Sequence, residues 1–215
     1  MSYGSLAQNV ALSFHVEGCS REAAEYAVAN WHYSRKIPVG RTISYSVWED
    51  ESFRGVVVFG RGSSPQIGKA FHIRQDRVCE LVRVALRSHV TPVSRILAVC
   101  VRLLRDGNPN LRLILSFADP RHGHHGGIYQ AAGWLYLGES KSTPLVRMHG
   151  RLRHHRSVLA ACGSWSDLAR LRSIDPRAEH VVVPAKHRYA LPLDLEMRTM
   201  LGPLVQPNPK RAPVV

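Results

Sequence analysis

The sequence predicts an α/β protein with a central mixed sheet flanked by helices. A nearly continuous apolar run at 111–119, typical of a buried central strand, follows a helical pattern at 91–107. Alternating runs at 43–49 and 53–60, joined by the turn-like segment 49–52, indicate an antiparallel hairpin before that helix. A helix that connects two strands lets them pair in parallel, and the hairpin adds antiparallel strands, so the sheet is expected to be mixed.

The expected elements can be placed along the chain by their end signals. Ser20 is a favourable N-cap, and apolar residues recur at helical spacing from Ala23 to Trp31. Thr91 and Pro92 have the residue types of an N-cap and a first helical position, ahead of the 91–107 pattern that closes at Gly107. Further strands are expected at 78–86, 134–140 and 144–150, and helical segments at 128–134, 164–172 and 184–201.

Length and composition limit the class of protein. A chain of 215 residues fits one well-buried domain. We expect a main domain over 1–150 and a basic C-terminal extension, 151–215, packed on the same core. The four cysteines form no C-x-x-C pair, no apolar run is long enough to cross a membrane, and no secretory leader is visible. These features predict a cytoplasmic protein.

Charge points to the kind of partner. Lys and Arg number 29 against 16 Asp and Glu, a formal net charge of +13, and Arg outnumbers Lys. Arg suits bidentate contact with phosphate, so the excess predicts a polyanion such as duplex DNA. The basic run 147–156 has cation spacing suited to a DNA backbone, with a solvated surface as the alternative. The oligomeric state stays open, a homodimer included.

Several residues could carry chemistry, each with an ordinary structural alternative. Asp119 ends the predicted central strand, where ligands of open α/β sheets bind, but Asp-Pro also starts turns. His32 lies between Trp31 and Tyr33, aromatic residues that could stack on a base or pack in the core.

A cluster of histidines at 122–125 raises the question of a metal. Imidazole nitrogens bind iron and zinc well, but neighbouring histidines seldom point at one ion, and loop histidines also contact phosphate. The candidate ligands are His32, Asp119 and His124.

The order of predicted elements resembles the acetyl-coenzyme A-dependent acetyltransferase (GNAT) superfamily. In that superfamily the loop after a central strand holds the coenzyme diphosphate at the next helix N-terminus, and 88–95 has the corresponding place. The usual glycine-rich loop is here SHVTPVSR. The segment IYQAAGWLYLG resembles the tyrosine element of the superfamily, which implies that Tyr129 is the general acid for the leaving thiolate. The alternative is a packed helix tyrosine with its hydroxyl at the surface. The implied coenzyme contacts are Arg83, Val84, Ser88, Val90, Thr91, Ser94 and Arg95.

Four segments, HYSRKIPVG, VVVFGRG, ELVRVAL and above all SFADPRHGHHGGIYQAAGWLYLG, resemble the phage Mom family of DNA modification proteins. With PAKHRYALPLD, the resemblance runs from about Trp31 to Lys210. It implies conversion of the exocyclic amine of adenine to a carbamoylmethyl derivative that protects phage DNA from host restriction. Acetyl-coenzyme A is the implied donor, although simple acyl transfer would leave an acetamide, and iron is also implicated.

The resemblance and the residue types together give one set of candidates. The expected catalytic residues are Tyr129, Asp119, His32 and Ser116. An adenine paired in duplex DNA must be flipped out to reach them. The expected nucleic acid contacts are Trp31, Tyr33, Arg35, Arg121, His124, Arg147, Arg151, Arg153, Lys186 and Arg188. The alternatives are an acetyltransferase of a small amine or protein lysine, and a non-catalytic DNA-binding anti-restriction protein.

Overall fold

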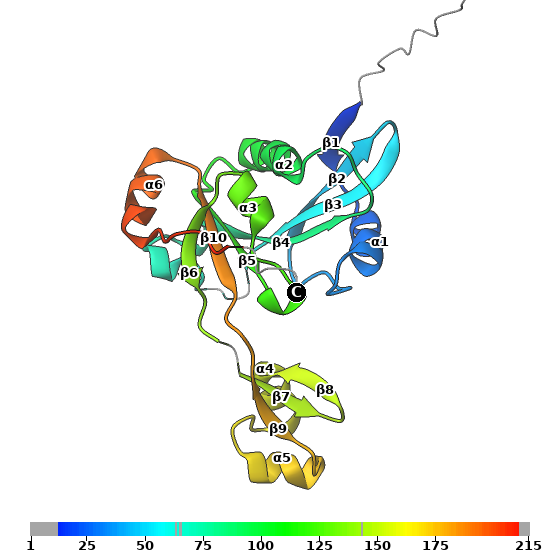
Figure 1. Ribbon diagram of the computed structural model, residues 1–215, viewed down its shortest axis with the longest axis vertical. Coiled ribbons are helices and arrows are strands. Elements are labelled where there is room, and N and C mark those ends of the chain that lie inside the picture. The colour runs from blue at the N-terminus through cyan, green and yellow to red at the C-terminus, as the bar shows by residue number, and fades with distance from the viewer. Residues whose placement is uncertain (1–12, 63, 65, 143, 211–215) are drawn as a thin grey trace, which may run out of the picture. The chain divides into compact units, whose positions relative to one another are not determined.

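The computed structural model describes residues 13–62, 64, 66–142 and 144–210 (Figure 1). The chain divides into two compact units. The predicted boundary at residue 150 falls inside the second unit, and the last five residues of the expected extension, 211–215, lie outside the described residues. The first unit comprises Met1–Ser116, Ile128–Leu135 and Ala190–Val205, and the second comprises Phe117–Gly127, Tyr136–Tyr189 and Gln206–Val215.

The first unit is built on a mixed sheet with the strand order β1-β2-β3-β4-β5-β10. The strands β1 to β4 pair antiparallel in chain order, and β5 pairs parallel to β4. Together with the flanking helices, this sheet confirms the predicted fold class. The bounds are β1 Phe14–Gly18, β2 Thr42–Glu49, β3 Ser52–Gly60, β4 Val78–Leu86, β5 Leu113–Ala118 and β10 His187–Pro192.

The predicted hairpin is β2 and β3, joined by Asp50 and Glu51. Both residues have positive φ angles, 45° and 57°, as a tight hairpin turn matching the strand twist requires. The alternation expected for β3 is wrong in its second half: Val56, Val57 and Val58 are all fully buried, so both faces of the strand are covered there.

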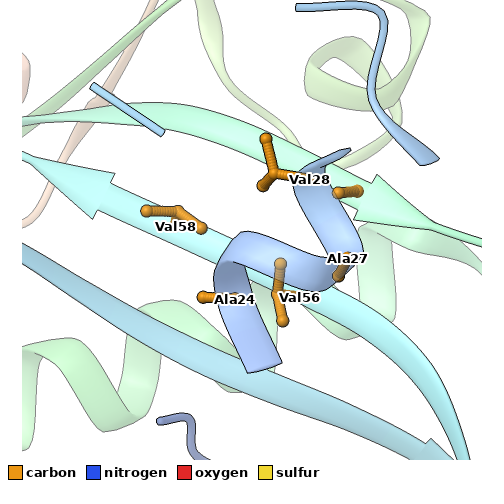
Figure 2. Close-up of a cluster of buried hydrophobic side chains, with 6 residues drawn as sticks. Ala24, Ala27, Val28, Val56 and Val58 are labelled. Atoms are coloured by element: carbon orange, nitrogen blue, oxygen red, sulfur yellow. The ribbon is translucent and has the colours of Figure 1, made fainter. Parts of the chain in front are cut away.

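The helix α1, Arg21–Trp31, covers one face of this sheet. Ser20 caps it as predicted, accepting a hydrogen bond from the Ala23 amide at 3.2 Å. Figure 2 shows Ala24 and Ala27 of α1 against Val56 and Val58 of β3. The small alanine side chains let the helix approach the sheet closely.

The helix α2, Val93–Gly107, connects β4 to β5. It buries Ile96, Leu97, Cys100, Val101 and Leu104, a stripe at helical spacing. The sequence placed its N-terminus wrongly by one residue: Pro92 is the N-cap, without a side-chain cap bond, and Thr91 is buried. The hydroxyl of Thr91 therefore does not cap the helix.

The second unit contains β6 beside β10 and a separate three-stranded antiparallel sheet, β8-β7-β9. The core of that small sheet joins Val146 and Met148 of β7 with Val158 of α4 and Leu171 of α5. Figure 1 shows these two helices packed on it. The bounds are β6 Leu135–Glu139, β7 Pro144–Met148, β8 Arg151–His154, α4 His155–Cys162, α5 Leu168–Ile174 and β9 Glu179–Val182.

The helical region expected over 184–201 is wrong in its first half. Residues His187–Pro192 form the strand β10, and only Leu195–Leu201 form a helix, α6, capped by Asp194. Tyr189 and Ala190 of this strand are both fully buried. Their burial in the sheet favours a strand over the predicted helix. The remaining helical segments are α3 Gly127–Ala131 and the 3₁₀ turns Lys69–Phe71, Gln75–Arg77, Pro120–His122 and Gly202–Leu204. Within the described residues, no helix is both long and apolar enough for a membrane span.

Candidate active site

The candidate site lies where the parallel strands β4 and β5 stop pairing. Their ladder covers three residue pairs and ends at Glu80 and Leu115. The pairing of β4 with β3 also shifts there, since Phe59 lies opposite Leu81 and Val58 opposite Arg83, leaving Val82 as the extra residue of a bulge. Bulges of this kind redirect side chains and backbone groups near functional sites.

Two hydroxyl groups meet at this point. Ser116 follows the last paired residue of β5, and its Oγ donates to the carbonyl oxygen of Leu81 on β4 at 2.8 Å. The same Oγ lies 2.8 Å from the phenol oxygen of Tyr129, from α3. The side chains of Ser116 and Tyr129 are 1% and 8% exposed. The alternative that Tyr129 keeps its hydroxyl at the surface is therefore wrong.

The two hydroxyl groups in this chain of three oxygens can exchange a proton. A carbonyl oxygen only accepts, whereas each hydroxyl donates one hydrogen bond and accepts others. When Ser116 donates to Leu81, the phenol donates to Ser116. When Ser116 donates to the phenol oxygen, the phenol can pass its own proton to another group, and the resulting phenolate is stabilised. The structure thus joins two predicted catalytic residues, Ser116 and Tyr129, in an arrangement suited to delivering a proton.

The backbone amides of the loop before α2 already bind a carboxylate of the protein. The carboxylate of Glu49, at the end of β2, accepts hydrogen bonds from the amide of Val90 at 3.0 and 3.1 Å and from the amide of Thr91 at 2.6 Å. Arg54 lies 3.5 Å from the same carboxylate. Glu49 is fully buried. Burial raises its pKa, but the bonds from Thr91 and Val90 and the charge of Arg54 outweigh burial and leave it lowered.

A coenzyme diphosphate does not fit at these two amides, because Glu49 occupies their hydrogen-bonding positions. Sequence reasoning missed Glu49, which reads as the polar end of a hairpin strand. The other implied coenzyme contacts stay predictions. Arg83 donates to the carbonyls of Lys36 and Val82, at 3.0 and 2.6 Å, and Arg95 lies over the ring of Phe14. Val84 and Ser94 are half-buried and Ser88 is exposed.

In the second unit, Asp119 is the centre of a charge cluster. Its carboxylate accepts from the amide and guanidinium of Arg121, at 2.8 to 3.1 Å, and lies 3.6 Å from Nζ of Lys186. The side chain is 2% exposed. Burial would raise its pKa, but the bonds from Arg121 and the charge of Lys186 lower the pKa to about 2. The carboxylate is thus ionised at neutral pH, and suits accepting a hydrogen bond better than holding a proton.

The turn predicted at Asp119 and Pro120 is also present. Asp119 caps the 3₁₀ turn Pro120–His122 through the Arg121 amide. The interpretation of Asp119 as a turn former is therefore confirmed, and its role in binding the substrate stays a prediction. Two cations predicted to contact nucleic acid, Arg121 and Lys186, form ion pairs with the Asp119 carboxylate.

The histidine candidates do not gather into a metal site. Among the described residues, no group of three or more His, Cys, Asp or Glu side chains is placed to hold an ion. The residues present do not fit the implied iron. Burial and the neighbouring His122 lower the pKa of His124, which favours its neutral form. His32 ends α1 as its C-cap, and its Nδ1 lies 2.8 Å from the Ser34 hydroxyl.

The aromatic candidates differ in accessibility. Trp31 packs edge-on to Tyr26 and against Phe53, with Arg87 over its ring. Trp31 thus has the contacts of the packing alternative. Tyr33 is 48% exposed with its ring against His32, which leaves it the better candidate for stacking on a base.

The remaining arginines predicted to contact nucleic acid differ in exposure and in their bonding partners. Arg35 is exposed in the loop after α1. Arg147 pairs with Glu179 at 2.6 Å. Arg188 is half-buried and donates to the Leu137 carbonyl at 2.8 Å. Arg151 and Arg153 are exposed on β8. A role for each in binding nucleic acid stays a prediction.

The fold and the site define an α/β protein with a buried serine–tyrosine hydroxyl pair at the fork of two parallel strands. A sequence profile described as the Mom protein family matches residues 13–210. The chain belongs to the Mom protein family. It is 27% identical over 202 residues to a curated relative, "Methylcarbamoylase mom" of Escherichia phage Mu, with 91% of this chain and 83% of the relative covered.

Solved structures similar to this chain include acyl-transferring enzymes. One is FeeM, an N-acyl amino acid synthase from uncultured soil microbes, with a TM-score of 0.49, 13% identity, and coverage of 91% of this chain and 98% of that one. Another is a Bacillus subtilis acetyltransferase in complex with CoA, with a TM-score of 0.45, 12% identity, and coverage of 85% and 99%.

Proposed function

We propose that the protein is a transferase that modifies the exocyclic amine of adenine in duplex DNA to an N6-carbamoylmethyl group and so protects the DNA from restriction. The observation that carries the proposal is the buried hydroxyl pair of Ser116 and Tyr129 at the fork of β4 and β5. It is supported by membership of the Mom family and by likeness to a relative named methylcarbamoylase. We place the reaction in the cytoplasm of an infected bacterium.

The chemistry requires proton transfer and orientation. The adenine amine is a weak nucleophile because its lone pair is delocalised into the ring, so the enzyme must orient it and accept its proton. Tyr129 would donate a proton to the leaving group of the donor, and Ser116 would stabilise the phenolate that remains. This phenolate would then take up the proton that the adenine amine loses, which restores the phenol. Asp119 would accept a hydrogen bond from the amine, consistent with a carboxylate that stays ionised at neutral pH.

The donor and the DNA are bound by different parts of the protein. We propose a donor related to acetyl-coenzyme A, whose diphosphate is not held by the Val90 and Thr91 amides. Acyl transfer from acetyl-coenzyme A itself would leave an acetamide, so the donor must carry a carbamoylmethyl group bonded to its leaving atom. The bond between N6 and that group forms as the bond to the leaving atom breaks. The net charge of +13 supports duplex DNA as the partner. Tyr33, with its exposed ring, would stack on the flipped adenine.

A restriction-protection assay tests the catalytic part of this proposal. Tyr129→Phe removes only the phenol oxygen, and we expect modification to slow by about 100-fold or more, the usual contribution of a general acid. Plasmid from cells that express this variant should be cut by a nuclease that spares plasmid from wild-type cells. Tyr26→Phe, a change on the exposed side of α1, is the matched control and should keep protection.

The same assay separates catalysis from mere DNA binding. We expect Asp119→Asn to lose protection as well, since an amide replaces the ionised acceptor. If Tyr129→Phe and Asp119→Asn both protected plasmid as well as wild type at equal expression, the non-catalytic DNA-binding alternative would replace this proposal.

A further inference from the structure

A hollow of about 620 Å³ lies at the C-terminal end of α2, on the first unit. Its size is typical of a ligand site. Four arginines line it, namely Arg77, Arg102, Arg105 and Arg112. None of the candidate residues of the active site lies in its lining. The hollow is therefore a separate feature of the surface.

The hollow carries an excess of positive charge, because four arginines line it against the two carboxylates of Asp106 and Asp194. Arg112 is neutralised, because it binds Asp194 through two bonds of 2.7 and 2.9 Å and Glu196 at 2.9 Å. Within the described part of the chain, Arg77, Arg102 and Arg105 form no ion pair with an acid. One further carboxylate, Asp106, lines the hollow. Three guanidinium groups facing one space favour an anion.

The end of the helix is also prepared for an anion. Carbonyl oxygens at a helix C-terminus normally repel negative charge. Here Asn108 covers two of them, since its amide donates to the Arg105 carbonyl and its Nδ2 donates to the Leu104 carbonyl at 2.8 Å. The Arg112–Asp194 pair fixes one wall of the hollow.

The hollow lies at the opposite end of the strand pair from the active site. Arg77 and Arg112 immediately precede β4 and β5, and the Arg112 amide donates to the Arg77 carbonyl at 2.9 Å. Ser116 lies further along β5, about 13 Å from Arg112 at the usual rise of a strand. A ligand in the hollow would not reach the reacting atoms, so it would anchor a larger molecule or bind on its own.

We propose that this hollow is a phosphate-binding site that takes a backbone phosphate of duplex DNA. The choice of DNA as the source of the phosphate rests on the proposed function. Arg77, Arg102 and Arg105 bind the phosphate oxygens, and the contact holds the duplex at a distance from the base being modified. Such contacts set position and affinity without reading sequence.

The test compares two double variants of the full chain. Arg102→Ala with Arg105→Ala removes two charges from the exposed side of α2 and keeps good helix formers. Arg21→Ala with Arg41→Ala removes the same charge from exposed positions outside the hollow and is the control. Affinity for a duplex of about 30 base pairs, three helical turns, is measured by fluorescence anisotropy over a range of salt concentrations.

We expect the first pair to weaken DNA binding by about tenfold and to reduce the salt dependence by about one to two phosphate contacts. The control pair should show less than about a third of that loss in the logarithm of affinity. Equal affinities and equal salt slopes for the two pairs would overturn DNA as the occupant.

A titration with inorganic pyrophosphate, followed by calorimetry, separates the two sources of phosphate. Pyrophosphate binding that the first pair abolishes, with DNA binding unchanged, would keep the anion site and replace DNA by a free phosphate compound. No effect of the first pair in either measurement would overturn the site altogether. If the wild type failed to bind DNA at all, the proposed function would fail, while the pyrophosphate titration would still decide on the hollow.

Discussion

The two ends of α2 meet anions in opposite ways. At the N-terminal end, where the helix dipole favours negative charge, the amides of Val90 and Thr91 already bind the buried carboxylate of Glu49. At the C-terminal end, four arginines line an open hollow against two carboxylates, those of Asp106 and Asp194. A helix N-terminus at the position where related folds bind a phosphate is therefore not always open to a ligand. The chain can fill that position itself and keep accessible positive charge elsewhere.

Glu49→Ala should have the largest effect on stability. The change leaves two backbone amides without their acceptor in a buried place, and we expect a loss of about 3 kcal/mol in the free energy of unfolding. Urea denaturation measures it. Glu17→Ala, an exposed glutamate on β1, is the control and should change stability little. A loss below about 0.5 kcal/mol would mean that Glu49 does not hold the loop, and the N-terminal end would be open to a ligand.

The pH dependence of stability gives a second test of the filled end. The pKa of Glu49 is lowered in the folded protein from 4.5, so the unfolded chain binds its proton more readily. Its stabilising contribution is complete above that pH and is lost as the pH falls below it. We therefore expect wild type to lose more stability than Glu49→Gln between pH 6 and about pH 3, as followed by urea denaturation.

Other carboxylates do not disturb this comparison. Asp119 and Asp194 also have lowered pKa values, each about 2, and their contributions are common to both proteins. Parallel pH profiles for wild type and Glu49→Gln would show that the carboxylate of Glu49 gains nothing from the loop amides.

The smallest effect is expected at the arginine end. Asp194→Asn keeps a good N-cap for α6 but removes a charge that neutralises Arg112. Glu196 still pairs with Arg112, but the lining loses one negative charge. We therefore expect pyrophosphate to bind about twofold more tightly, measured by calorimetry. Leu195→Ala, an exposed change one residue away, is the control. Weaker binding to Asp194→Asn than to wild type would show that the ion pair shapes the hollow more than its charge opposes an anion.

Local patterns were sufficient to predict the elements with strong signals. The cap at Ser20, the stripe of α2 and the apolar run of β5 follow from rules that act within one segment. The strand β10 was read as helix because strand formation there depends on a neighbour far along the chain, which the sequence of 184–201 does not reveal.

The sequence also predicted only part of the candidate site. Ser116 and Tyr129 were both candidates, but their hydrogen bond depends on where β4 and β5 separate, which is a tertiary property. Glu49 gave no signal, since an acid beside a turn is ordinarily exposed. Arg102 and Arg105 are spaced as neighbours on one face of a helix, a signal that would have marked them only if the empty space beside them were known.

Mass spectrometry of nucleosides, from the DNA of cells that express the chain, tests the central claim most directly. Wild type should yield a deoxyadenosine that carries a carbamoylmethyl group, and the Tyr129→Phe variant should yield deoxyadenosine without it. Unmodified deoxyadenosine from cells with folded wild-type protein, accompanied by new acetylation of a small amine or of protein lysine, would contradict the claim and favour an ordinary acetyltransferase.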